Sequence, residues 1–145
     1  MSFNTTFANE LGLLIFNGTA IADIAENDTS APLTAYYIAL HTADPGAGGT
    51  GSTNEANYTG YARVSVNRNS GGFTVTSNVV SNTAAVTFGA CTAGSSTVTY
   101  FSITVASSGT SKILARGALT ASLAVTAGIT PAFATGALTA TFATT

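Results

Sequence analysis

The sequence has 145 residues, of which 46% are hydrophobic and only 7% are charged, with a formal net charge of −2. This length suits one domain with a core of its own, but the charge content is far below the roughly 25% of an ordinary globular domain. With only four basic residues, the chain lacks the Lys/Arg cluster of a nucleic-acid-binding surface, and no apolar run approaches the ~18 residues of a membrane span. A surface of Thr, Ser, Asn and Ala loses little hydration on contact, which favours permanent assembly. A soluble monomer with a hydroxyl-rich coat has the same composition and remains the alternative.

The few charges are unevenly distributed along the chain. All acids precede residue 56 and all bases follow it. An acidic front and a basic back can pair between neighbouring subunits, or they can compensate each other within one fold, which is the simpler explanation. The acids are Glu10, Asp23, Glu26, Asp28, Asp44 and Glu55, and the bases are Arg63, Arg68, Lys112 and Arg116.

The N-terminal segment differs from the rest of the chain. Phe3, Phe7 and Leu11 recur at helical spacing, and Gly18 can cap the C-terminal end, which predicts a short amphipathic helix over roughly residues 4–17. The same aromatic side chains either cover one end of the fold or dock on a neighbour. The stretch has no basic n-region, so we expect no signal peptide and production in a cytosol.

From Leu33 onward the pattern is strand and turn. Turn signals such as Asp44-Pro45-Gly46 separate the runs, and a long Gly-, Thr- and Asn-rich loop follows that turn. The absence of intervening helices excludes a βαβ protein, and the strand number suits a jelly roll. We therefore predict an all-β, jelly-roll-like antiparallel β-sandwich of about eight strands with a short N-terminal α-helix. The helix and a connecting arm would occupy residues 1–31, and the sandwich residues 32–145. The strand candidates are residues 33–41, 61–68, 73–76, 84–88, 98–106, 112–116, 119–125, 131–134 and 137–142.

Catalytic chemistry has little support in the sequence. His41 and Asp44 stand three residues apart at the end of a predicted strand, and Ser and Thr are abundant, so a His-Asp-Ser arrangement can be imagined. No Gly-x-Ser-x-Gly elbow supports it. A lone histidine at a strand end suits the stabilisation of a turn, so we predict no catalytic residue and no enzyme.

Metal and cofactor sites are also weakly supported. Asp23, Glu26 and Asp28 offer the oxygen ligands that Ca²⁺ prefers, but their spacing does not match an EF-hand. Cys91 is the single cysteine, which excludes an internal disulfide and a cysteine metal site and suggests a small buried side chain. We predict no metal and no cofactor, with calcium at the acidic segment as the alternative.

The aromatic residues offer candidate interface anchors. Strand alternation over residues 61–68 would turn Ala62 toward the core and Tyr61 and Arg63 outward, and Tyr37 would face outward in the same way. Exposed tyrosines on a strand are common at interfaces, although a half-buried strand tyrosine is an ordinary feature. The candidate interface residues are Phe3, Phe7, Tyr37, Asp44, Glu55, Tyr58, Tyr61 and Arg63.

Three segments carry a family resemblance: Tyr37–Gly46 (YIALHTADPG), Thr59–Val66 (TGYARVSV) and Ala127–Phe133 (AGITPAF). With them the chain resembles a family of small tailed-bacteriophage virion proteins over about residues 1–142. Members are often labelled tail fibre protein, and their size and β pattern are also similar to those of jelly-roll head decoration (cement) proteins. The motifs mark strand ends and turns, so the resemblance carries over no catalytic residue. The chain departs from the family at the turn 105–112, where an acidic Asp-Ala pair is replaced by Ser and Gly.

The resemblance and the composition together imply a structural virion protein. Our first expectation is a capsid decoration protein, a homotrimer that binds the major capsid protein on the outer surface of the capsid, made in the host bacterial cytoplasm. The Gly-rich loop and the N-terminal segment would supply the contacts. The alternative is a tail, fibre or baseplate component, as adaptor or receptor-binding protein, although the absence of Trp weakens a carbohydrate-binding tip. A small enzyme or free lectin has no positive feature, and neither nucleic acid nor membrane is expected as a partner.

Overall fold

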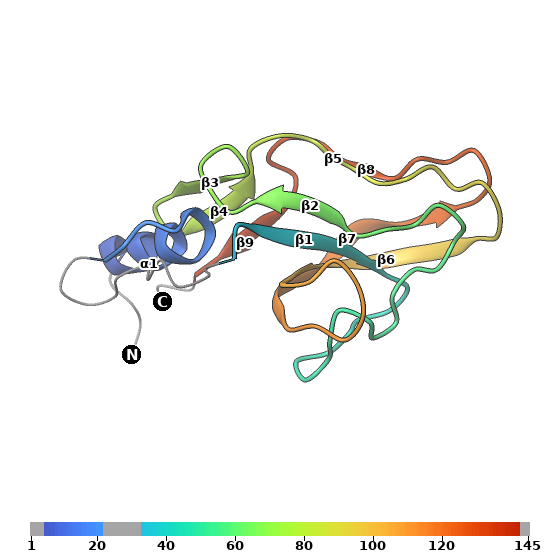
Figure 1. Ribbon diagram of the computed structural model, residues 1–145, viewed down its shortest axis with the longest axis horizontal. Helices are drawn as coiled ribbons and strands as arrows, with labels where there is room; N and C mark the ends of the chain where they lie inside the picture. Colours follow the sequence, from blue (N-terminus) through green and yellow to red (C-terminus); the bar gives the residue numbers. More distant parts are fainter. Residues whose placement is uncertain (1–4, 22–32, 143–145) are drawn as a thin grey trace. The chain divides into compact units, whose positions relative to one another are not determined.

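The computed structural model describes residues 5–21 and 33–142 (Figure 1). One helical segment comes first, the α-helix α1 (Thr5–Gly12) continued by the π-helical turn η1 (Leu13–Asn17), and nine strands follow in the described part of the chain. The strands are β1 (Ala35–His41), β2 (Val64–Asn67), β3 (Phe73–Thr76), β4 (Val79–Asn82), β5 (Val86–Thr87), β6 (Ser96–Thr104), β7 (Ile113–Val125), β8 (Ala132–Phe133) and β9 (Thr139–Thr141).

The strands form three sheets, with the orders β2-β1-β6-β7, β3-β4-β9 and β5-β8. The register pairs that define β1–β6, β3–β4, β4–β9 and β6–β7 are all antiparallel. The chain divides into two compact units. Unit 1 comprises residues 1–35, 66–86 and 133–145, and unit 2 comprises residues 36–65 and 87–132.

Unit 1 combines the helical segment with the sheet β3-β4-β9. Gly18 ends the helical segment in the left-handed conformation at φ 69°, as the sequence predicts. Phe16 is buried and meets the ring of Phe73 edge-on at a centroid distance of 5.0 Å. A Cβ at Gly12 would lie 2.9 Å from a methyl group of Val75, so glycine permits the close approach of helix and sheet.

Two polar side chains tie the segments of unit 1 together. Arg68 donates to the carbonyl oxygens of Leu14 and Ile15 at the C-terminal end of the helical segment. Asn82 is almost completely buried. Its amide nitrogen donates to the carbonyls of Ala84 and Ala134 at 2.8 Å, and its oxygen accepts from the backbone N–H of Leu138 at 2.9 Å.

Unit 2 holds most of the four-stranded sheet. Strand β1 pairs with β6, its partner far along the sequence, in the register Tyr37↔Thr104 to His41↔Tyr100. Pairing between strands that are distant in sequence is typical of Greek-key and jelly-roll sandwiches. One face of the pair carries the core residues Ile38, Leu40, Phe101 and Ile103, and the other carries the buried polar residues His41, Ser102 and Thr104.

The predicted fold class is confirmed: the protein is an antiparallel β-sandwich protein with about the expected number of strands and one short N-terminal helix. Strand β4 is not among the predicted strands, because Ser77 (φ 57°) and Asn78 form a tight turn that starts a second strand at once. The two strands predicted over residues 112–116 and 119–125 are one edge strand, β7, which begins at Ile113 and is continuous through Gly117.

The predicted alternation at the start of β2 is wrong. Ala62 is exposed and Arg63 is buried, because the regular strand begins only at Val64 and the guanidinium of Arg63 is bound from within. The predicted boundary between residues 31 and 32 lies outside the described residues. The division into a helical arm and a sandwich domain therefore stays a prediction.

Candidate functional site

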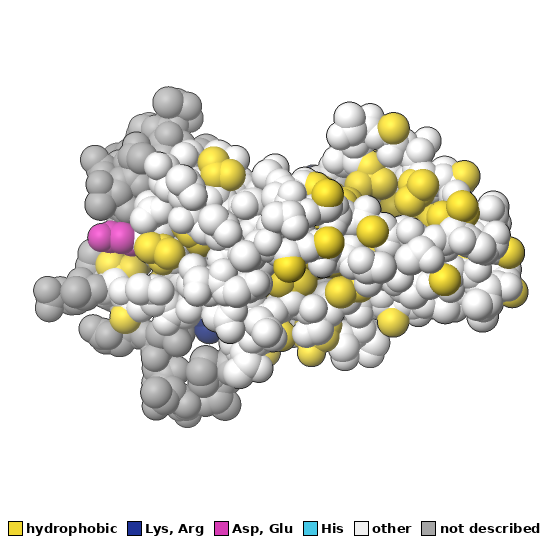
Figure 2. All heavy atoms as spheres, turned by 90° about the horizontal axis from the view of Figure 1, so that it is seen from above, with side chains coloured by type: hydrophobic (Ala, Val, Ile, Leu, Met, Phe, Trp, Pro, Cys, Tyr) yellow, Lys and Arg dark blue, Asp and Glu magenta, His cyan; other side chains and the backbone are white. Residues whose placement is uncertain are grey.

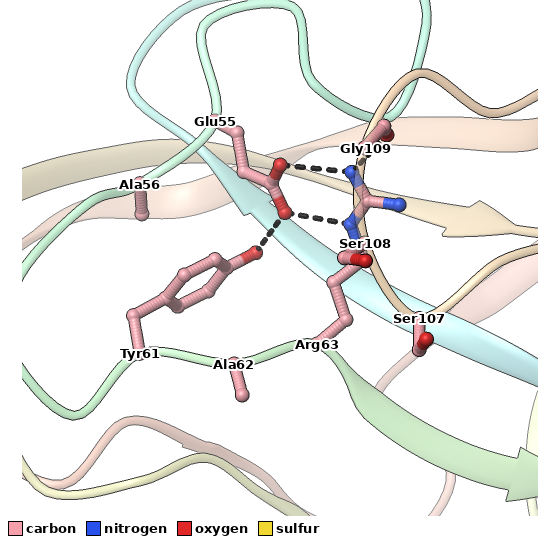
Figure 3. A pocket seen from close by; sticks show the side chains of 8 residues that line it. All are labelled: Glu55, Ala56, Tyr61, Ala62, Arg63, Ser107, Ser108 and Gly109. Carbon is pink, nitrogen blue, oxygen red and sulfur yellow. Dashed lines mark hydrogen bonds and ion pairs between the residues drawn. The ribbon is translucent and has the colours of Figure 1, made fainter.

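The densest group of polar side chains in unit 2 surrounds Glu55. Its carboxylate receives two parallel hydrogen bonds from Arg63, Nε to Oε1 at 2.6 Å and Nη2 to Oε2 at 2.8 Å. The hydroxyl of Tyr61 donates a third, to Oε1 at 2.9 Å. Figure 3 shows both side chains pointing at the carboxylate from the segment that leads into β2. Arg63 is the bidentate partner that fixes a carboxylate in both distance and orientation.

The guanidinium of Arg63 is completely satisfied. Besides the two bonds to Glu55, Nη1 donates to the carbonyl of Ala106 and to the hydroxyl of Ser111, both at 2.9 Å, and Nη2 donates to the carbonyl of Gly109 at 2.8 Å. All five N–H groups of the side chain are thus used. The side chain is 1% exposed, and the bonds to Glu55 raise the pKa of Arg63 above its usual value. Arg63 therefore ties the turn that follows β6 to the loop that carries Glu55.

Tyr61 is held on the same framework. Its hydroxyl also accepts from the backbone N–H of Leu40 at 3.1 Å, and its ring stacks on Phe88 with an interplanar angle of 9°. Tyr58 meets the ring of Tyr61 edge-on and donates to the carbonyl of Gly89 at 3.0 Å. Burial raises the pKa of both tyrosines. These two rings are packed and hydrogen-bonded inside unit 2.

A hollow of about 290 Å³ lies over this cluster, lined by Glu55, Ala56, Tyr61, Ala62, Arg63, Ser107, Ser108 and Gly109 (Figure 3). The ionisable groups in its wall already bind one another. The serine hydroxyls and backbone groups that remain can form hydrogen bonds with a contacting surface. The cluster chiefly fixes the shape of two loops.

His41 is fully buried, on the polar face of the β1–β6 pair. Its Nδ1 lies 2.8 Å from the carbonyl oxygen of Thr53, which assigns the proton to Nδ1, and its Nε2 accepts from the hydroxyl of Ser102 at 2.7 Å. Burial is the main cause that lowers the pKa of His41. Ser102 is also fully buried, so a substrate cannot reach this Ser–His pair without unfolding around it.

Asp44 does not complete a triad with His41. Its Oδ1 accepts from Nε of Arg116 at 2.7 Å and from the backbone N–H of Gly46 at 2.8 Å, the second bond closing the predicted turn. The bond from Arg116 is the largest cause that holds the pKa of Asp44 below its usual value. His41 and Asp44 therefore stabilise the strand end and the turn separately.

The structure brings four of the eight predicted interface residues together, namely Glu55, Tyr58, Tyr61 and Arg63. Tyr37 is half-buried on β1, and Asp44 lies in the exposed turn. Phe3 lies outside the described residues, as do the calcium candidates Asp23, Glu26 and Asp28, and Phe7 lies in α1 with its side chain not described. In the described ranges 5–21 and 33–142, no three metal-binding side chains lie close together. The interface role of the eight residues stays a prediction.

Sequence reasoning missed the inward direction of Arg63 and the partners of His41. The sequence does hold a signal for the contact of Arg63 with Glu55. This acid and this base are eight positions apart, and Gly60 between them allows the chain to turn back. Nothing in the sequence points to Ser102 or Thr53 as partners of His41. Ser102 reaches His41 through the pairing of β1 with β6, and Thr53 reaches it because the loop that follows β1 folds back toward the strand. Cys91 is buried, as predicted.

Charge compensation within the subunit is confirmed for the described residues. Two of the four bases pair with acids, Arg63 with Glu55 and Arg116 with Asp44, and Arg68 binds backbone carbonyls. Figure 2 shows a face on which nearly all visible side chains are hydrophobic or uncharged. No helix in the part of the chain that the structure describes is long and apolar enough to cross a membrane. The protein presents a surface that costs little to desolvate.

Residues 4–141 match the family model described as "Podophage GP4 fiber I protein gp80". No curated protein matches the chain.

Proposed function

Because the chain belongs to the podophage GP4 fiber I protein gp80 family, a phage tail fibre family, we propose that it is a structural component of the tail fibre apparatus of a phage particle. The match over residues 4–141 carries the proposal. It covers both compact units, so it concerns the whole described fold and not one shared motif.

The geometry supports a structural role in two ways. The three segments of the family resemblance hold turns and strand ends together: Asp44 closes a turn, and Arg63 ties two loops. In the third segment, the N–H of Gly128 donates to the carbonyl of Cys91, and the carbonyl of Pro131 accepts from the N–H of Phe88. All these contacts lie within unit 2 and hold its turns and strand ends in fixed positions, which supports a structural role.

We also propose that the protein is not an enzyme. The Ser102–His41 pair is sealed inside the fold, and the hollow beside Glu55 is lined by ionisable groups that already bind each other. Purified protein mixed with polysaccharide from the surface of the host should release no new reducing ends. Release that is abolished in Ser102→Ala would contradict this part of the proposal.

The location in the particle tests the main proposal. An epitope tag introduced into the phage gene, followed by immunogold labelling of intact particles, should mark the tail. Quantitative mass spectrometry should find far fewer copies of this chain than of the major capsid protein. Gold spread over the head, with a copy number comparable to that of the capsid protein, would instead indicate the decoration role and would overturn the fibre assignment.

A further inference from the structure

Strand β7 forms one edge of the four-stranded sheet, and it is 13 residues long. Its inner edge pairs with β6 at residue 113, over residues 115–118 and over residues 123–125. On the outer edge, the described residues provide a bridge only from Thr50 to Lys112, immediately before β7 begins. Beyond that point, no strand in the described part of the chain pairs with the outer edge, toward which alternate backbone N–H and C=O groups point.

This edge lacks most of the features that protect edge strands. Proteins usually keep such edges from pairing with charged side chains, proline, a bulge or a covering segment. The sequence of β7, ILARGALTASLAV, has no proline, no acid and no lysine. Its one charge, Arg116, is paired with Asp44 of the same chain. Two irregularities interrupt the pairing with β6. In one, Thr99 of β6 lies opposite residues 119–122, and in the other, between Ile103 and Thr104, Leu114 has no opposite residue; the regular stretch 115–118 lies between them.

The side chains of β7 also lack cover. Leu114 and Leu123 are both 37% exposed, and every residue from 120 to 124 is exposed. The inward-facing positions from Ile113 to Leu119 are only half-buried, whereas most of the neighbouring strand β6 is buried. A strand added along the edge would pair the backbone groups and cover aliphatic side chains on both faces.

The chemistry of the edge indicates its occupant. The free groups require an extended backbone, and the uncharged, aliphatic and hydroxyl side chains require a partner of the same kind. The sheet of a second copy has two such edges, β7 itself and the four-residue β2 at the opposite side. Copies repel each other weakly, because the formal net charge is −2 and the charge on the edge is already compensated.

We propose that the outer edge of β7 binds a second copy of this chain by strand addition, centred on residues 115–118. Pairing of β7 with β7 would give a two-fold dimer, and pairing of β7 with β2 would close a ring such as the predicted homotrimer. The proposal concerns the isolated subunit and does not depend on where the protein lies in the particle.

Two edge variants and one control test the proposal. Ala118→Lys and Leu123→Lys place on β7 the charge that normally protects edges, whereas Val79→Lys introduces the same charge at a position that is also 37% exposed, on β4. Light scattering after size exclusion and sedimentation velocity over a dilution series give the stoichiometry and the dissociation constant. We expect a multimeric wild type, dissociation constants raised about tenfold or more in the edge variants, and no change in Val79→Lys. Circular dichroism and thermal unfolding check that each variant is folded.

Hydrogen exchange gives an independent measurement on the unmodified protein. In the assembly both sets of alternate amides in residues 115–118 should exchange slowly, and on dilution to the monomer the outer set should become fast. A wild type that is monomeric at micromolar concentration would overturn the proposal. So would edge variants that associate like the wild type. Neither result would bear on the tail location, which is measured on the particle.

Discussion

Replacing Arg63 by Met is the sharpest test of how the two loops of unit 2 are held. The substitution keeps most of the side-chain volume but removes all five N–H donors. The carboxylate of Glu55, 19% exposed, loses its bidentate partner. Breaking a buried ion pair by removing one partner typically costs 3–5 kcal/mol, and the partial access of water to Glu55 favours the lower end, about 3 kcal/mol.

Urea unfolding measures this loss. With a slope of about 1–3 kcal/mol per molar urea, the midpoint should fall by about 1–3 M. Hydrogen exchange should accelerate in the turn between Ala106 and Ser111, whose acceptors lose their donor. The added substitution Glu55→Gln removes the unpaired charge, so the double variant should be more stable than Arg63→Met alone.

Arg116→Met is the matched control. It breaks the other ion pair of unit 2, whose side chains are 35% and 43% exposed, and we expect no measurable change in the unfolding free energy. The reasoning fails if Arg63→Met costs less than about 1 kcal/mol, below the range for buried pairs, or if both variants cost the same.

Three further predictions concern single residues. Asn82→Ala removes three hydrogen bonds from a buried site, and urea unfolding should show a loss of about 3 kcal/mol; a loss below about 1 kcal/mol would mean that water replaces the side chain. Gly60→Ala should lower the melting temperature more than Gly128→Ala. Both glycines have positive φ (101° and 91°), but only at Gly60 would the new Cβ lie 2.2 Å from a backbone atom, the carbonyl oxygen of Ala90. Equal losses would mean that backbone strain alone, and not this close contact, determines the effect. Burial holds the pKa of His41 below 6.5, so the unfolded state binds more protons than the folded state at acidic pH. The unfolding free energy should therefore decline as the pH falls below about 6.5. The same decline in His41→Gln, which removes the one histidine, would show that His41 is not its cause.

Local patterns predicted the elements well where one residue type dictates the backbone. The helix ends at Gly18 because an αL residue is needed there, and β3 begins and ends as predicted because a tight glycine-containing turn precedes it. The prediction failed at β4, which follows β3 directly after the tight turn of Ser77 and Asn78. Strand β4 ends in Ser81 and Asn82, and Asn82 is buried because its amide binds two other segments, which no local pattern reveals.

The candidate site shows the same division. The uneven charges suggested pairing, and the sequence left open whether acids and bases meet within one subunit or between two. The fold decided this, because the loop after β1 returns to bring Glu55 to Arg63 and because Asp44 reaches Arg116 on β7, 72 residues away. Ion pairs over such separations depend on strand order and register.

The sequence by itself determined that this protein is all-β, that its charges are few and that no local motif for catalysis is present, because composition, period-two alternation and turn residues are local properties. Only the tertiary structure decided which polar residues are buried and which strand is left at an edge. Arg63 is buried because segments distant in sequence surround it with acceptors, and β7 is an edge strand because the strand order of the described residues ends there. The low charge first suggested assembly, and the edge of β7 is a specific place at which that assembly can be tested.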